Sequence, residues 1–167
     1  GVWWNMIKGD WTWATGPKHG ATTANVERYI DFAAADAIEG VLVEGWNVGW
    51  NGDWFGNGNG MEFDRPTPDF DATAIQRYAA AKGVYIVGHN ETGGSSSHYD
   101  SQLDRAFGYA QAHGIPVVKT GYVTDAGQIE LVDADGSKHR EWHEGQWNVN
   151  HYTRVVQTAA KYHVSID

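Results

Sequence analysis

Short apolar runs alternate along this chain with segments of helical periodicity, and this alternation limits the possible folds more than any other feature. The runs occupy residues 2–4, 41–43, 84–87, 115–118 and 164–167. Continuous apolar strands separated by helices are typical of a parallel sheet that is covered on both faces. The sequence therefore predicts an α/β fold.

Four amphipathic helices are expected between these runs. Thr22 or Thr23 is placed to cap the first helix, Asp71 to cap the second, and Gly83 to end it. The apolar positions expected to face the core follow helical spacing: Val26, Tyr29, Ile30, Ala33 and Ala37; Ile75, Tyr78 and Ala79; Leu103, Ala106, Phe107 and Ala110; Val149, Tyr152, Val155, Val156 and Ala159. Residues 125–139 read as a polar, hairpin-like insertion with a turn at Asp135 and Gly136.

Two architectures fit this pattern: a complete, open flavodoxin-like sheet, or part of a (β/α)8 TIM-type barrel. Four βα units and a fifth strand make about half of a barrel, which needs ~250 residues. Polar side chains directly follow the apolar runs at Asn5, Glu44, His89, Glu91 and Lys119. Polar groups that converge from successive strand ends are typical of barrel enzymes. The pattern therefore favours residues 1–167 as the N-terminal half of a barrel, without an internal domain boundary.

Charge and composition exclude several classes of protein. The chain has 12 Lys+Arg against 21 Asp+Glu and a net charge of -9, so it lacks the basic stripe of a nucleic-acid-binding protein. No apolar run approaches the ~18 residues of a membrane span, and there is no cysteine for disulfides or thiolate chemistry. Nine tryptophans, three of them at positions 46, 50 and 54, suit either a packed core or a site for flat sugar rings.

Glu91 is the strongest candidate for a catalytic role. It follows His89 at a strand end and precedes glycines, so it could act as a general base that activates water; a surface glutamate in a loop is the alternative. Glu44 and Lys119 follow other strands, where they could bind a substrate or form a structural ion pair. The histidines show no metal-binding spacing, and His151 is expected to be a hydrogen-bonded helix residue.

Several motifs together resemble the catalytic barrel of glycoside hydrolase family 97. They are Gly-Val-Trp-Trp at residues 1–4, Val-Glu-Gly-Trp-Asn-x-Gly-Trp at 43–50, Gly-His-Asn-Glu-Thr at 88–92 and Val-Lys-Thr-Gly-Tyr at 118–122. Residues 19–23 and 150–152 fit as well, so the resemblance extends over essentially the whole chain in order.

The resemblance implies a calcium-dependent, exo-acting α-glucosidase or α-galactosidase from the bacterial periplasm or cell surface, acting on oligosaccharides. Glu91 matches the general base, and the substrate-binding residues would be Glu44, Trp46, Asn47, His89 and Lys119. The general acid, a His-Glu-Pro motif and most calcium ligands belong to later family segments, as does the other half of the barrel, and β-domains flank the barrel. We therefore expect the chain alone to be inactive.

The residue at position 121 predicts whether hydrolysis retains or inverts the anomeric configuration. Retaining members of the resembled family have an aspartate nucleophile where this chain has glycine, so the resemblance implies inversion. Two alternatives remain open at this point: a non-catalytic carbohydrate-binding module with tryptophan platforms, and a flavodoxin-like domain that binds a small ligand.

Overall fold

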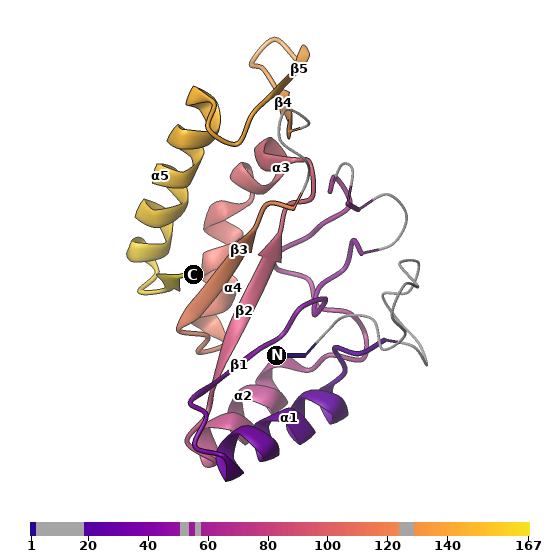
Figure 1. Cartoon of the computed structure of the whole chain (residues 1–167), viewed down its shortest axis with the longest axis vertical. Coiled ribbons are helices and arrows are strands. Elements are labelled where there is room, and N and C mark those ends of the chain that lie inside the picture. The colour runs from indigo at the N-terminus through magenta and orange to yellow at the C-terminus, as the bar shows by residue number, and fades with distance from the viewer. Residues whose placement is uncertain (3–18, 51–53, 56–57, 124–128) are drawn as a thin grey trace.

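The computed structural model describes residues 1–2, 19–50, 54–55, 58–123 and 129–167, and shows an α/β fold built on a parallel sheet (Figure 1). The strands are β1 (Gly40–Leu42), β2 (Tyr85–Glu91), β3 (Val117–Gly121) and β6 (Ser165–Ile166), hydrogen-bonded in that order. Val2 forms a parallel bridge with Val43, beside β1. The expected Asn5 and residues 3 and 4 lie outside the described residues.

Strand order distinguishes the two predicted architectures. Each strand pairs in parallel with the strand that precedes it in the main sheet. Since parallel connections are right-handed, an order without reversal places successive helices on the same face. A doubly wound sheet needs a point where the order reverses, and the described strands contain none. The flavodoxin-like alternative is therefore not supported.

Burial also differs between the two faces of the sheet, as expected if the helices lie on one face. Val41, Val43, Ile86 and Val118 are buried on the helix side. The opposite face carries Leu42, Val87 and Val117, which are only half-buried. Within the described part of the chain the helices therefore cover one face of the sheet, and a cover on the opposite face stays a prediction.

The helices begin and end where short-range rules place them. They are α1 (Thr23–Ala35), α2 (Ala72–Ala81), α3 (Ser96–Asp100), α4 (Leu103–Ala112) and α5 (Gln146–Lys161). The Thr22 side chain accepts from the Asn25 N–H and the Asp71 side chain accepts from the Ala74 N–H, so both predicted caps are present. Gly83 follows α2 with a φ of 71°, which favours glycine.

The predicted core faces are correct for α4 and only partly correct for α1 and α5. Tyr29, Ala37, Val149 and Val156 are exposed rather than buried. Helix α1 packs beside α2, and α5 packs beside α3 and α4, so each outer helix has neighbours on one side only in the described part of the chain. The far side of each apolar stripe consequently faces solvent.

The insertion between β3 and α5 contains an antiparallel hairpin of β4 (Ile129–Val132) and β5 (Lys138–Glu141), drawn at the top of Figure 1. Its turn closes with a hydrogen bond from the Gly136 N–H to the Asp133 carbonyl, and Gly136 has a φ of 84°. The second strand thus reaches Glu141, two residues beyond the predicted segment. Among the described helices, none has both the length and the apolar character to cross a bilayer.

Candidate active site

A cavity of about 310 Å³ opens at the carboxyl ends of the parallel strands. The segment that follows β1, the last residues of β2 and β3, and the residues directly after β3 supply its walls, as expected for a site at the strand ends of a parallel sheet. The lining residues are Glu44, Trp50, Trp54, His89, Glu91, Lys119, Thr120, Gly121, Tyr122 and Val123. Four of the six predicted site residues therefore lie in one cavity: Glu44, His89, Glu91 and Lys119.

Glu91 is the last residue of β2 and only 2% exposed. Its Oε1 accepts hydrogen bonds from the N–H groups of Gly93, at 3.0 Å, and Val123, at 3.4 Å. Burial raises the pKa of Glu91, while backbone hydrogen bonds from residues 92, 93 and 123 oppose the rise and the charge of Glu44 adds to it. A carboxylate with a raised pKa is a stronger base, which suits proton abstraction.

His89 lies two residues before Glu91, so both side chains are on the same face of β2. Burial, with the nearby charge of Lys119, lowers the pKa of His89 to about 3, so its ring is neutral at physiological pH. The 3.8 Å separation between His89 Nε2 and Glu91 Oε2 is therefore not an ion pair. His89 Nδ1 is buried and has no hydrogen-bond partner within the described part of the chain.

Glu44 and Lys119 approach each other from opposite sides of β2. Lys119 is paired with His89 in the β2–β3 register, and its Nζ lies 3.8 Å from Glu44 Oε1. Burial raises the pKa of Glu44, although Lys119 acts to lower it. The Lys119 side chain is 41% exposed, so this long contact leaves the ammonium group accessible from the cavity.

Gly121 provides the space that the Glu91 carboxylate occupies. The two residues are register partners on β3 and β2. A Cβ atom at position 121 would overlap Oε2 of Glu91, and would lie 2.8 Å from its Cδ and 3.2 Å from His89 Nε2. The Glu91 side chain as placed here therefore requires glycine at position 121.

Comparison with known proteins identifies the family of this chain. The family model described as Glycoside hydrolase 97 matches residues 3–167. The chain belongs to glycoside hydrolase family 97.

Solved structures of this family are similar in both sequence and fold. An enzyme from Pseudoalteromonas sp. strain K8 in complex with acarbose is 48% identical, with a TM-score of 0.87 over 91% of this chain. A variant of that enzyme in complex with panose is 47% identical, with a TM-score of 0.88 over 94%. In both cases this chain covers 23% of the solved chain.

A crystal structure of a beta-arabinopyranosidase is a more distant match. It shares 16% identity, with a TM-score of 0.52, over 87% of this chain and 19% of that one. At this identity the match supports the fold alone.

Trp46 and Asn47, both predicted to bind substrate, do not line the cavity of this family 97 chain. Gly45 has a φ of 81°, and this left-handed residue ends the strand alternation that would have kept Trp46 on the face of Glu44. Trp46 instead stacks on Tyr109 of α4 at 4.9 Å, and its Nε1 donates to the His89 carbonyl at 2.8 Å. In this structure Trp46 therefore supports β2 from the side of the sheet that packs against α4.

Two other tryptophans take the place that the sequence analysis gave to Trp46. Trp50 and Trp54 line the cavity with ring centres 4.8 Å apart, and Trp50 lies 5.9 Å from the His89 ring. Asn47 is fully buried, and its Oδ1 accepts from Trp50 Nε1 at 3.0 Å, so it positions this wall. The recurrence of tryptophan at every fourth position, 46, 50 and 54, pointed to this region, but spacing alone could not show which rings reach the cavity.

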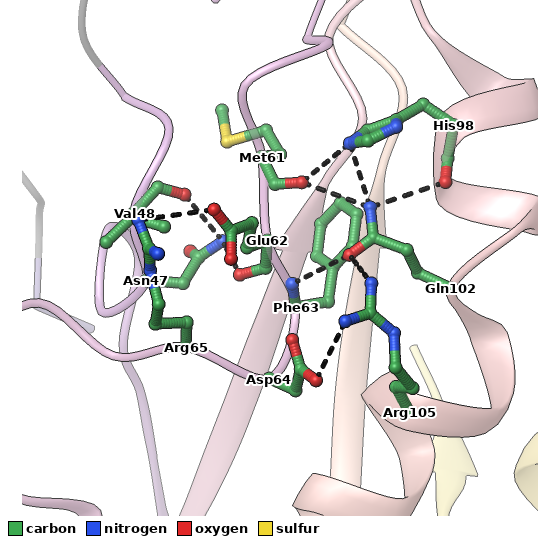
Figure 2. Close-up of polar contacts among 10 residues, drawn as sticks. All are labelled: Asn47, Val48, Met61, Glu62, Phe63, Asp64, Arg65, His98, Gln102 and Arg105. Carbon is green, nitrogen blue, oxygen red and sulfur yellow. Dashed lines mark hydrogen bonds and ion pairs between the residues drawn. The ribbon is translucent and has the colours of Figure 1, made fainter.

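The loop that carries these tryptophans is tied to α3 and α4 by a polar network, shown in Figure 2. Gln102 Nε2 donates to the Met61 carbonyl at 3.1 Å, and its Oε1 accepts from the Phe63 N–H at 3.4 Å. Arg105 bonds both Gln102 and Asp64. This network holds the end of the loop at residues 61–64. Asn47, at the start of the loop, is joined to it because Asn47 Nδ2 donates to the Glu62 carbonyl at 2.9 Å.

Two aspartates near the start of α2 have different roles. Asp71 caps α2, as predicted, whereas Asp69 pairs with buried His19 at 3.0 Å. His19 also contacts the Gly45 carbonyl through Nε2 at 2.9 Å. It thereby joins the start of α2 to the turn after β1.

A calcium site is not formed by the described residues alone. No group of three or more His, Asp or Glu side chains with a metal-binding arrangement occurs among them. In the cavity, Glu91 Oε1 is occupied by backbone donors and Glu44 faces Lys119. Calcium therefore stays a prediction, and no step below is assigned to it.

Replacing Gly121 by alanine should displace the Glu91 carboxylate and destabilise the protein by about 1–3 kcal/mol, the usual cost of overpacking. Thermal or urea denaturation measures the change. Gly60→Ala is the matched control, because a Cβ atom there meets nothing closer than 3.7 Å. Equal stability of the two variants would contradict the tight fit between positions 91 and 121.

Glu91→Gln should stabilise the protein near neutral pH. Since burial raises the pKa of Glu91, the folded state holds its proton to higher pH than the unfolded state. The wild type therefore loses stability as pH rises from the pKa of the unfolded state through the higher pKa of the folded state, and glutamine avoids that loss. We expect a higher melting temperature for the variant at about pH 7 and no gain at about pH 4 or below. A gain that is independent of pH would refute this explanation.

Proposed function

We propose that this chain forms part of a (β/α)8 catalytic barrel that releases terminal α-linked glucose or galactose from oligosaccharides with inversion, with Glu91 as general base. One observation carries the proposal: a buried carboxylate at a strand end occupies the space that a side chain at position 121 would need. Because this chain covers 23% of its solved relatives, the activity proposed is that of the whole enzyme.

The surroundings of Glu91 suit a base that acts on water. Two backbone N–H groups hold Oε1, which leaves Oε2 facing His89 and the cavity. In the proposed step Oε2 takes a proton from a water molecule, the water oxygen attacks the anomeric carbon, and the glycosidic bond breaks on the opposite face. The leaving oxygen needs a proton from a general acid, which the resemblance assigns to a later segment of the enzyme.

Sugar binding is assigned to the other walls of the cavity. His89, Lys119 and Glu44 offer hydrogen-bonding groups, and Trp50 and Trp54 offer flat apolar faces. Such a mixture of polar groups and aromatic rings suits a sugar, which has hydroxyl edges and apolar ring faces. The relatives from Pseudoalteromonas were solved with acarbose and panose, and we extend that ligand class to this chain.

The proposal of inversion follows from the same cavity. In the retaining members that this chain resembles, an aspartate at the position of Gly121 is the nucleophile. Here any side chain at 121 would collide with Glu91, so the two arrangements exclude each other. A water-activating glutamate and a nucleophilic aspartate are thus alternative uses of one space.

Calcium dependence, a periplasmic or secreted location in a bacterium, and flanking β-domains are proposed on the resemblance alone. A non-catalytic sugar-binding module has no need for a buried glutamate beside a neutral histidine, so the site does not favour that alternative.

Glu91→Gln in the whole enzyme should lower kcat by at least ~10²-fold, the usual scale for loss of a general base, with a smaller change in KM. Steady-state hydrolysis of an aryl α-glycoside measures both constants. Glu62→Gln is the matched control, because Glu62 lies outside the cavity and pairs with exposed Arg65. A kcat within a few-fold of the wild type for Glu91→Gln would show that Glu91 is not the base.

The first sugar released should be the β-anomer. A single displacement by water inverts the α-configuration, which proton NMR detects before the anomers equilibrate. Early accumulation of the α-anomer would show retention and would remove the role proposed for Gly121.

A further inference from the structure

A chain of hydrogen bonds leads from a helix end to the wall of the cavity. Asp100, at the end of α3, lies 2.7 Å from Nδ1 of His151 on α5, and His151 Nε2 lies 2.8 Å from the Tyr122 hydroxyl. Tyr122 lines the cavity, directly after β3. Sequence analysis predicted a hydrogen-bonded His151 and did not connect it with the site.

The partners of His151 define the direction of these bonds. An ionised carboxylate can only accept, so the Nδ1–H of His151 donates to Asp100, and in the neutral ring Nε2 accepts from the Tyr122 O–H. Burial opposes ionisation of Asp100, but hydrogen bonds from His151 and Arg154 hold its pKa below the ordinary value. The Tyr122 hydroxyl thus has His151 Nε2 as a buried partner at 2.8 Å and also interacts with the Thr120 side chain.

The imidazole ring has little freedom to move. His151 is fully buried, is stacked on Trp147 with ring centres 5.5 Å apart, and meets the edge of Tyr99 at 5.7 Å. A rigid, buried acceptor fixes the position of Tyr122 better than a surface partner could.

The residues on either side of Tyr122 contact Glu91 directly. Gly121 leaves space for Oε2, and its carbonyl accepts from Thr92 N, at 3.0 Å, and Thr92 Oγ1, at 2.9 Å. Val123 donates its N–H to Oε1 of Glu91 at 3.4 Å. The strand end is thus held by Thr92 before Tyr122 and by His151 at Tyr122 itself.

We infer that Asp100, His151 and Tyr122 form a positioning relay that holds the Val123 N–H against the Glu91 carboxylate. The inference rests on the proposed role of Glu91 as general base. His151 is a positioning residue, since it acts on Glu91 only through Tyr122 and Val123.

The pH dependence of hydrolysis tests the relay. Tyr122→Phe keeps the ring and removes the hydroxyl, so the Val123 N–H should contact Oε1 less often. Because that hydrogen bond favours ionised Glu91, the acid limb of kcat/KM should move to higher pH, with a roughly 5- to 10-fold loss of kcat/KM on that limb. The titratable groups that surround Glu91, namely Glu44, His89 and Lys119, are unchanged in this variant.

Two substitutions at His151 separate its two hydrogen bonds. The amide of His151→Asn can replace Nδ1 and keep the bond to Asp100, whereas the longer His151→Gln can replace Nε2 and keep the bond to Tyr122. We expect His151→Asn to shift the acid limb as Tyr122→Phe does, and His151→Gln to restore it. Asp104→Asn is the control, because Asp104 bonds Lys161 across the exposed ends of α4 and α5 without touching the relay.

An unchanged acid limb in both Tyr122→Phe and His151→Asn, together with lower melting temperatures, would overturn the relay and leave a packing role. If Tyr122→Phe does not fold, His151→Asn against His151→Gln decides the same question. Glu91→Gln keeps the two proposals apart. Full activity of Glu91→Gln would remove the general base. An inactive Glu91→Gln, together with unshifted acid limbs in Tyr122→Phe and His151→Asn, would remove the relay alone.

Discussion

The burial of the Glu91 carboxylate is the constraint on which the rest of the site depends. A charged group that is 2% exposed must be compensated or must change its protonation, and here the backbone N–H groups of Gly93 and Val123 both donate to Oε1. Gly121 gives the other oxygen its space, and neutral His89 lies beside it. Each neighbour is thus suited to a carboxylate that keeps one oxygen available for chemistry.

The second level of organisation is the support behind these walls. Trp46 contributes to the site from the helix side, by holding the His89 carbonyl and stacking on α4. Gln102 and Arg105 hold the long loop after β1, and Asn47 holds Trp50. Because these residues are outside the cavity, they act on it only through geometry, and small displacements there would be transmitted to the rings that line it.

Local rules made much of this structure predictable from the sequence. The caps Thr22 and Asp71, the glycine after α2, and the polar residues at the strand ends all depend on a few neighbouring residues. What escaped prediction depends on distant ones. The link from His151 to Asp100 spans two elements, and the exposure of Tyr29 and Val149 depends on which helices lie beside them. The orientation of Trp46 is an exception, because it follows from the backbone of the neighbouring Gly45. The family resemblance pointed to Gly121, but only the packing explains why glycine is needed there.

The strand order without reversal has a consequence for how the site is built during synthesis. Every strand of the main sheet pairs with the one made just before it, so each closure of the chain involves a loop of modest length and a modest entropic cost. The walls of the cavity are consequently completed in the order of translation: Glu44 first, then His89 and Glu91, and Lys119 to Val123 last. Glu91 would acquire its Gly93 donor as soon as β2 and the residues after it have left the ribosome, and its Val123 donor only when the next unit follows.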